Sequence, residues 1–143
     1  MHLNIIIAAC MMFATTAIHA GGMVLAMQVF EWRKDRLTKP MIRISMVSGV
    51  VILMFLASVL EVLVWAITYL ALNAIEGFEK ALYFSMVTYT TLGYGDVVLI
   101  ERWRLLSSFE AANGIIMFGW TTAIVVGVVQ RVYASQRSDN VQN

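Results

Sequence analysis

Three long stretches of this chain carry almost no charged side chains. Residues 3–30 contain none, residues 44–75 contain only Glu61, and residues 105–130 contain only Glu110. Helices of these lengths would measure about 39–48 Å, which exceeds the roughly 30 Å hydrocarbon core of a bilayer. The first run lacks a preceding Lys or Arg, so a cleaved signal peptide is not expected there. The sequence therefore predicts three membrane-spanning helices.

The composition agrees with a membrane protein and excludes several other classes. Hydrophobic residues make up 60% of the chain and charged residues only 13%, whereas soluble domains have about 45–50% and about 25%. A formal net charge of +1 argues against a basic nucleic-acid-binding surface. One cysteine, Cys10, excludes an intrachain disulfide and is expected to be a buried, inert thiol. With only two histidines besides, no zinc site is expected.

A fourth apolar stretch, residues 81–100, differs from the other three. It contains Gly93, Gly95 and Asp96 close together, after three threonines. Such a backbone is a poor helix, and irregular backbone is tolerated at membrane depth only where it lines a protein-buried or water-filled space. We therefore predict a re-entrant segment, with a short helix over about residues 78–90 followed by an extended loop.

The basic residues predict the orientation. Residues 31–43 form a basic linker that is expected in the cytoplasm, which places the N-terminus outside and the C-terminus in the cytoplasm. Trp65, Tyr69 and Trp103 are typical of the outer membrane interface. A second interpretation of the linker is binding of anionic lipid headgroups. Its basic residues are Arg33, Lys34, Arg36, Lys39 and Arg43.

Residues 90–96, Thr-Thr-Leu-Gly-Tyr-Gly-Asp, strongly resemble the selectivity filter of the potassium channels. The resemblance continues through residues 81–90, similar to that family's pore helix, and through Arg104-Leu105-Leu106, Gly114-Ile115 and Phe118-Gly119, similar to its inner helix. Residues 40–133 thus resemble the two-transmembrane pore-loop plan. With the extra N-terminal span, the chain is similar to the small three-span prokaryotic members of the ion-channel family.

This resemblance implies an all-α membrane protein with three transmembrane helices, a re-entrant pore helix and a selectivity-filter loop, assembled as a homotetramer. The implied division is an N-terminal helix (1–30), the basic linker (31–43), a pore domain (44–134) and a short cytoplasmic tail (135–143). Within the pore domain, the outer helix would span 44–75, the pore helix and filter 78–96, and the inner helix 103–134.

Carbonyl oxygens can replace the hydration shell of a potassium ion when a strand turns them toward one axis, and alternating glycines permit that turn. The expected K+ ligands lie in Thr91, Leu92, Gly93 and Tyr94, with Gly95 completing the filter. K+ would be the only cofactor. Leu92 and Tyr94 are expected to pack outward against the pore helix. At the outer mouth, the resemblance implies a hydrogen bond between Tyr83 and Asp96, while Val87 occupies a position where some relatives have a hydrogen-bonding Glu.

Alignment to the family's inner helix implies that four residues face the aqueous cavity or gate: Ile115, Phe118, Thr122 and Val126. Val126 or Val129 would form a hydrophobic constriction. Gly114 has two interpretations, close helix contact or a bending point of the inner helix.

Glu61 and Glu110 are unexpected within spanning helices. Counting along the helices places Glu61 roughly 26 Å up its span and Glu110 about 9 Å below the outer boundary, so both lie at the depth of the pore helix. Each should face inward toward a polar partner or be protonated. The candidate partners are Ser85, Thr88, Tyr89 and Asn113. The candidate gating residues are Glu110, Gly114 and Glu61. Glu110 either makes a structural hydrogen bond or takes part in pH-dependent gating, whereas His19 is interpreted as a helix contact or a residue remote from the pore and not as a sensor.

The predicted function is passive, potassium-selective conduction across a prokaryotic inner (cell) membrane, and not enzymatic catalysis. Two alternatives stay open: a weakly selective cation channel, and a nonconducting membrane subunit that regulates a partner. No helix has the arginine spacing of a voltage sensor, so the sequence does not identify the gating stimulus.

Overall fold

The computed structural model describes the backbone of residues 2–33 and 40–142, and the side chains of residues 2–32 and 41–132. The described residues form four α-helices and a short 3-10 helix, with no strand. In chain order these elements are α1 (His2–Arg33), α2 (Pro40–Ala71), α3 (Phe78–Tyr89), η2 (Glu101–Trp103) and α4 (Arg104–Gln142).

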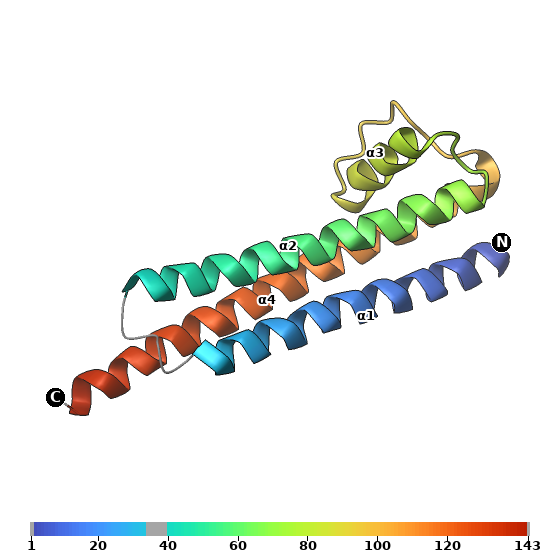
Figure 1. The fold of residues 1–143 in the computed structure, drawn as a ribbon. Helices are drawn as coiled ribbons and strands as arrows, with labels where there is room; N and C mark the ends of the chain where they lie inside the picture. The colour runs from blue at the N-terminus through green and yellow to red at the C-terminus, as the bar shows by residue number, and fades with distance from the viewer. Residues whose placement is uncertain (1, 34–39, 143) are drawn as a thin grey trace.

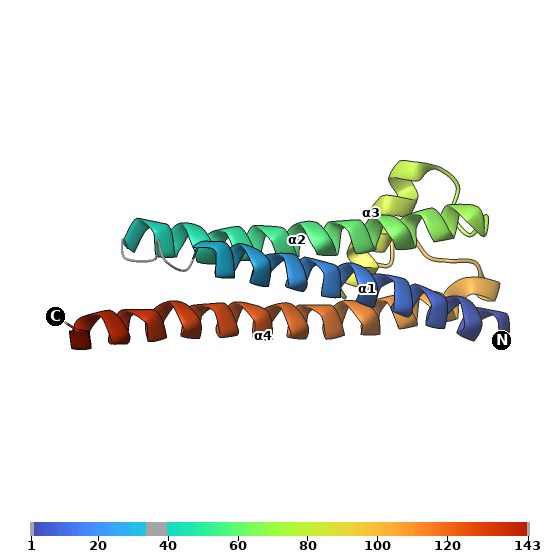
Figure 2. The same cartoon turned by 60° about the horizontal axis from the view of Figure 1, so that its bottom comes forward.

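The three long helices lie side by side and alternate in direction, while α3 lies across one end of the bundle (Figure 1). The N-terminus is at the α3 end and the C-terminus is at the opposite end in both views (Figures 1 and 2). Three segments are long and apolar enough to cross a membrane, namely His2–Trp32, Met41–Ala71 and Glu101–Val132. The prediction of three spanning helices is therefore confirmed at this level.

The second helix is displaced relative to the predicted range of 44–75. It begins at Pro40, which is suited to the first turn because that position needs no amide donor. It ends at Ala71, because Asn73 adopts a φ of +50° and redirects the chain. The amides of Asn73 and Ala74 donate to the carbonyls of Leu70 and Tyr69, at 2.9 Å each. This is a Schellman motif, a common helix terminator.

The last helix is longer than predicted. It runs to Gln142, through most of the segment 135–143 that was expected to be a tail. No Gly or Pro follows Gly127, so the sequence provides neither of the usual helix breakers there. The expected basic linker, 31–43, falls largely outside the described residues, which exclude the side chains of Arg33, Lys34, Arg36 and Lys39.

The interior is formed by two apolar clusters. One surrounds α3 and contains Trp65, Tyr69, Tyr89 and Trp103, together with residues from α1 and α4. The other fills the bundle farther from α3, between α1, α2 and α4. Trp65, Tyr69 and Trp103 were predicted to lie at the outer interface, but all three are at most 4% exposed. They instead belong to the apolar cluster around α3, where the Tyr69 ring meets Phe84 of α3 edge to face.

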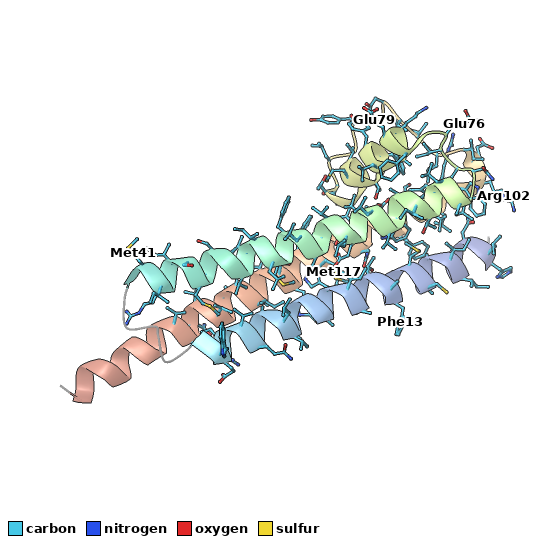
Figure 3. All side chains as sticks on the ribbon, viewed as in Figure 1. Phe13, Met41, Glu76, Glu79, Arg102 and Met117 are labelled. Carbon is cyan, nitrogen blue, oxygen red and sulfur yellow. The ribbon has the colours of Figure 1, made fainter. Side chains whose placement is uncertain are left out.

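The outer surface of the helices is apolar along the shaft and charged at the α3 end (Figure 3). Phe13 and Met41 project outward and are 79% and 81% exposed, whereas Met117 is buried. Cys10, expected to be buried, is also exposed on α1. Large apolar side chains that face outward on spanning helices are suited to contact with lipid.

Candidate functional site

The segment that follows α3 has an unusual backbone. We refer to residues 91–96 as the TLGYGD loop. Thr91, Gly93 and Gly95 have positive φ values of 60°, 57° and 78°, while Leu92 and Tyr94 between them have negative φ. Alternation in the sign of φ turns successive peptide units to the same side of the chain, which permits their carbonyl oxygens to form one row. A positive φ is rare for a β-branched residue such as Thr91, and such strain is concentrated at functional sites.

The start of the loop is anchored to the last turn of α3. The carbonyl of Val87 accepts hydrogen bonds from the amides of Leu92 and Gly93, at 2.9 and 3.2 Å. The amide of Thr91 donates to the carbonyl of Thr88 at 2.9 Å. The position of α3 therefore fixes where the loop begins.

The side chains of the loop are not covered by this chain. Leu92 is 55% exposed and Tyr94 is 68% exposed. The inward face of α3 is buried against α2 and α4, and the packing of Leu92 and Tyr94 against α3 stays a prediction. Most of the surface of these two side chains is therefore free for contacts outside this chain.

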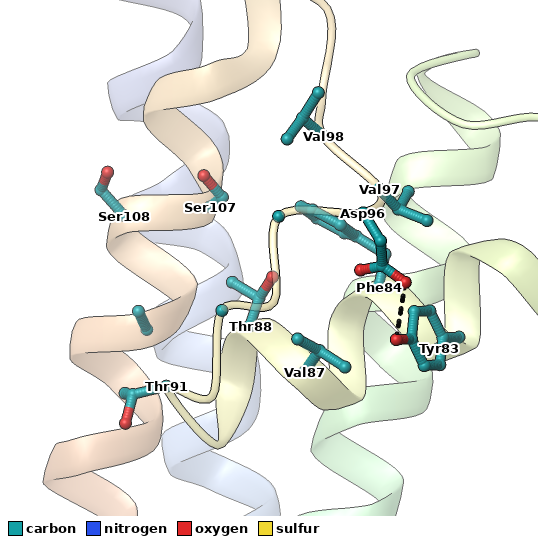
Figure 4. Close-up of a pocket in the computed structure, with 13 residues that line it drawn as sticks. Tyr83, Phe84, Val87, Thr88, Thr91, Asp96, Val97, Val98, Ser107 and Ser108 are labelled. Carbon is teal, nitrogen blue, oxygen red and sulfur yellow. Dashed lines mark hydrogen bonds between the residues drawn. The ribbon is translucent and has the colours of Figure 1, made fainter.

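A groove of about 370 Å³ lies between the TLGYGD loop, the outward side of α3 and the first turns of α4 (Figure 4). Its lining combines apolar side chains with hydroxyl groups. The hydroxyl-bearing residues that line it are Tyr83, Thr88, Thr91, Ser107 and Ser108. The loop is thus supported at its base and separated from α4 along its length.

At the far end of the loop, the Tyr83 hydroxyl donates to a carboxylate oxygen of Asp96 at 2.8 Å (Figure 4). This is the contact that the sequence resemblance implies. The hydrogen bond to Asp96 raises the pKa of the Tyr83 hydroxyl, because a phenolate could not donate it. The loop is therefore tied to α3 at both of its ends.

Glu110 of α4 is completely buried behind α3. Its two carboxylate oxygens accept hydrogen bonds from the hydroxyls of Ser85 at 2.5 Å and Tyr69 at 2.6 Å. Ser85 was among the predicted partners, whereas Tyr69 was not. The Ser85 hydroxyl also approaches the carbonyl of Val62 at 2.9 Å, so this site joins α2, α3 and α4.

Glu61 of α2 is also completely buried and also meets α3. The hydroxyl of Tyr89, a predicted partner, donates to one of its carboxylate oxygens. The other oxygen lies 2.9 Å from Nδ1 of His19 on α1. Asn113, another candidate partner, instead donates to the Thr15 hydroxyl at 2.9 Å, and Thr88 lines the groove.

The polar residues of α1 are the main feature that sequence reasoning missed. Asn4, Thr15 and His19 are buried and share the inward face of a helix that is otherwise apolar. A histidine within a spanning helix is rare and indicates an inward-facing function, so His19 could have been identified as a partner for a carboxylate.

The four residues expected to face an aqueous cavity are all exposed in the single chain. They are Ile115, Phe118, Thr122 and Val126. Gly114 lies on the buried side of α4, where a Cβ atom would be 2.0 Å from the carbonyl oxygen of Tyr89. Because α4 continues as a helix through Gly114, the structure explains this glycine by close helix contact.

The chain was compared with models of known protein families. A model of the ion channel family matches residues 50–131, which are 82 of the 143 residues. The chain belongs to the ion channel family. The match includes most of α2, all of α3 and the TLGYGD loop, and α4 as far as Arg131, but it leaves out α1. Searches of curated proteins and of solved structures found no match.

Membership in this family, together with three apolar helices of sufficient length, makes the chain a multi-pass membrane protein with a role in ion passage. It also supports a channel rather than an enzyme.

Proposed function

We propose that this protein is a potassium-selective channel in which the TLGYGD loop is the selectivity filter and α3 is the pore helix. The observation that carries the proposal is the alternation of positive φ at Thr91, Gly93 and Gly95 within this particular sequence. A row of carbonyl oxygens can replace the water around a dehydrated K+ ion. The proposed ion ligands are the carbonyls of residues 91–94 and the Thr91 hydroxyl.

The proposed assembly is a homotetramer around a fourfold axis. One chain supplies one loop, and a ring of carbonyls requires several loops around a common axis. The loop is irregular and exposed along residues 91–96, and such backbone is not stable against lipid. Neighbouring copies would cover Leu92 and Tyr94 and would bring the exposed α4 residues Ile115, Phe118, Thr122 and Val126 around a central cavity.

The proposed location is a prokaryotic inner membrane, with the filter and the N-terminus outside. The N-terminus and α3 share one end of the bundle, and the end of α1, the start of α2 and the C-terminus share the other (Figure 1). The basic linker would then face the cytoplasm, where its lysines and arginines are suited to anionic lipid headgroups.

Ion flux from liposomes tests the proposal. The purified protein is reconstituted into vesicles loaded with K+ or with Na+, and efflux is followed after dilution into an impermeant salt. Rapid K+ efflux with little Na+ efflux is expected. Comparable efflux of both ions would instead support a weakly selective cation channel, and absence of both would support a nonconducting regulatory subunit. Either of these results overturns the proposal.

Tyr83→Phe tests the outer end of the filter. This variant keeps the ring but removes the hydroxyl that donates to Asp96, so the filter should be held less firmly. We expect K+ current to decay faster during sustained opening, by a modest factor of about two, because exposed hydrogen bonds contribute little. Time courses of current in planar bilayers measure the decay. Unchanged decay would show that this contact does not stabilise the filter.

Glu110→Gln tests for a pH response. Glu110 faces the hydroxyls of Tyr69 and Ser85, and the other buried titratable groups around α3 are Tyr89, Glu61 and His19. Glutamine keeps the size of the side chain and cannot ionise. If Glu110 governs gating, K+ flux of the wild type should change across a pH series and that of the variant should change less. Identical pH profiles would exclude Glu110 as the sensor.

A further inference from the structure

The N-terminal helix α1 lies outside the matched ion channel segment, yet it packs into the bundle through polar contacts. Asn4 donates to the carbonyl of Arg102 at 2.7 Å, and Thr15 accepts from Asn113 at 2.9 Å. His19 is completely buried. Buried polar groups are costly unless each has a partner, so these contacts specify one rotational setting of α1.

His19 lies where α1, α2 and α4 meet. Its Nδ1 atom is 2.9 Å from a carboxylate oxygen of Glu61 on α2. Its Nε2 atom is 3.1 Å from the hydroxyl of Thr121 on α4, and its ring lies 5.2 Å from that of Trp120. Each nitrogen of the imidazole therefore contacts a different helix.

Glu61 extends this contact to α3. Its second carboxylate oxygen accepts a hydrogen bond from the Tyr89 hydroxyl. In the tautomer with the proton on Nδ1, Nδ1–H donates to Glu61 and the Thr121 hydroxyl donates to Nε2. Glu61 is then held from both sides by donors, one from α1 and one from α3. We call His19, Glu61 and Tyr89 the α1 relay.

Tyr89 is the last residue of α3 and lies two positions before Thr91, where the loop begins. Its backbone carbonyl contacts Gly114 so closely that a Cβ atom there would be 2.0 Å away. Its ring meets Phe118 edge to face, with centroids 5.6 Å apart. The backbone of Tyr89 is thus held against α4, and its hydroxyl is held by Glu61, with Ser58 as a further hydrogen-bond partner.

We propose that α1 supplies a positioning residue for ion conduction: His19, acting through Glu61, holds Tyr89 and thereby the inner end of the TLGYGD loop. The inference rests on the proposed function, because it assigns a role in conduction. It also gives the extra helix a defined role, since α1 places His19 against the carboxylate that holds Tyr89.

Two amide variants of His19 separate this role from simple packing. In His19→Asn, the side-chain amide occupies the position of Nδ1 and can still donate to Glu61. In His19→Gln, the amide extends toward the position of Nε2 and thus toward Thr121. Both variants lose the imidazole ring that packs on Trp120. A purely structural role predicts similar effects, whereas the proposal predicts that only His19→Asn keeps the wild-type K+ flux.

The measurement is K+ efflux from liposomes at equal amounts of assembled protein. We expect His19→Gln to lower the flux about tenfold, which corresponds to about 1.4 kcal/mol. Asn4→Leu is the matched control, because it removes another buried α1 hydrogen bond, to Arg102, outside the α1 relay. Its flux should match the wild type. Equal flux for His19→Asn and His19→Gln would overturn the proposal.

A double-mutant cycle gives a second test. Because His19 acts through Tyr89 in this account, His19→Gln should have no further effect on flux in a Tyr89→Phe background. Additive effects of the two substitutions would contradict the proposal. A wild-type protein without K+ flux would overturn the proposed function and this inference with it, whereas normal wild-type flux with additive variants overturns the inference alone.

Discussion

Replacing Gly93 with alanine is expected to abolish potassium-selective conduction while the protein still reaches the membrane. Gly93 has a φ of +57°, and the nearest atom to an added Cβ is the Thr91 carbonyl oxygen at 4.0 Å. The expected loss of conduction in Gly93→Ala is therefore caused by backbone strain and not by a steric clash of the added methyl group. A left-handed conformation costs an L-residue about 1–2 kcal/mol, and the cost recurs in every copy of a ring. The strain is relieved by turning the peptide unit, which removes its carbonyl from the row.

Gly77→Ala is the matched control for this variant. Gly77 has a φ of +87° and open space around its Cα, so alanine is strained there as well, but the residue precedes α3 and lies outside the loop. We expect Gly77→Ala to lower stability and leave ion selectivity unchanged. Selective K+ current from Gly93→Ala, measured in planar bilayers, would show that the TLGYGD loop is not the filter.

Gly114→Ala is expected to disrupt the packing of α4 against the end of α3. An added Cβ would lie 2.0 Å from the carbonyl oxygen of Tyr89 and 2.9 Å from its carbonyl carbon, both backbone atoms that no rotamer change can move. Overpacking of this kind costs about 1–3 kcal/mol or more. We expect a lower thermal unfolding midpoint in detergent and a weakened K+ flux, since the displaced Tyr89 leads directly into the loop.

Gly119→Ala provides the comparison on the same helix. A Cβ at Gly119 meets no atom within 4 Å, and alanine favours helix over glycine by roughly 0.5–1 kcal/mol. This variant should be as stable as the wild type or more so. Equal unfolding midpoints for Gly114→Ala and Gly119→Ala would mean that the close approach of α4 to Tyr89 does not exist in the assembled protein.

Much of the fold follows from the distribution of charge along the chain. The gaps between charged residues are long enough to identify three spans, and two glycines beside Asp96 distinguish the fourth apolar stretch from a span. The ends of the helices were predicted less accurately. The end of α2 depends on Asn73, which adopts a left-handed backbone conformation. The sequence alone does not show that Asn73 takes this conformation, because the residues around it are mostly apolar.

The partners of the two buried carboxylates were predicted in part. Counting residues along each helix gives the depth of Glu61 and Glu110, and that depth pointed correctly to Ser85 and Tyr89 on α3. The depth of a residue does not show toward which neighbouring helix its side chain points. Tyr69 and His19 were therefore missed, since which face of α1 or α2 turns inward depends on packing between helices. For the same reason, buried aromatic residues such as Trp65 were predicted to lie at the outer membrane interface.

The TLGYGD loop was found from its local sequence because its backbone geometry depends mainly on its own residues. The surroundings of the loop depend on other chains. Leu92 and Tyr94 were expected to pack on α3, but within one chain they are exposed. Their packing in the assembly is accordingly a property of the proposed tetramer and not of the single subunit.

The most direct test of the central claim is the reversal potential of single channels in a planar bilayer, with K+ on one side and Na+ at equal concentration on the other. If four TLGYGD loops form a potassium filter, current should reverse at a large potential of the sign that opposes K+ flow. A reversal potential near zero would mean that K+ and Na+ pass equally well, which would contradict a potassium-selective filter in this protein.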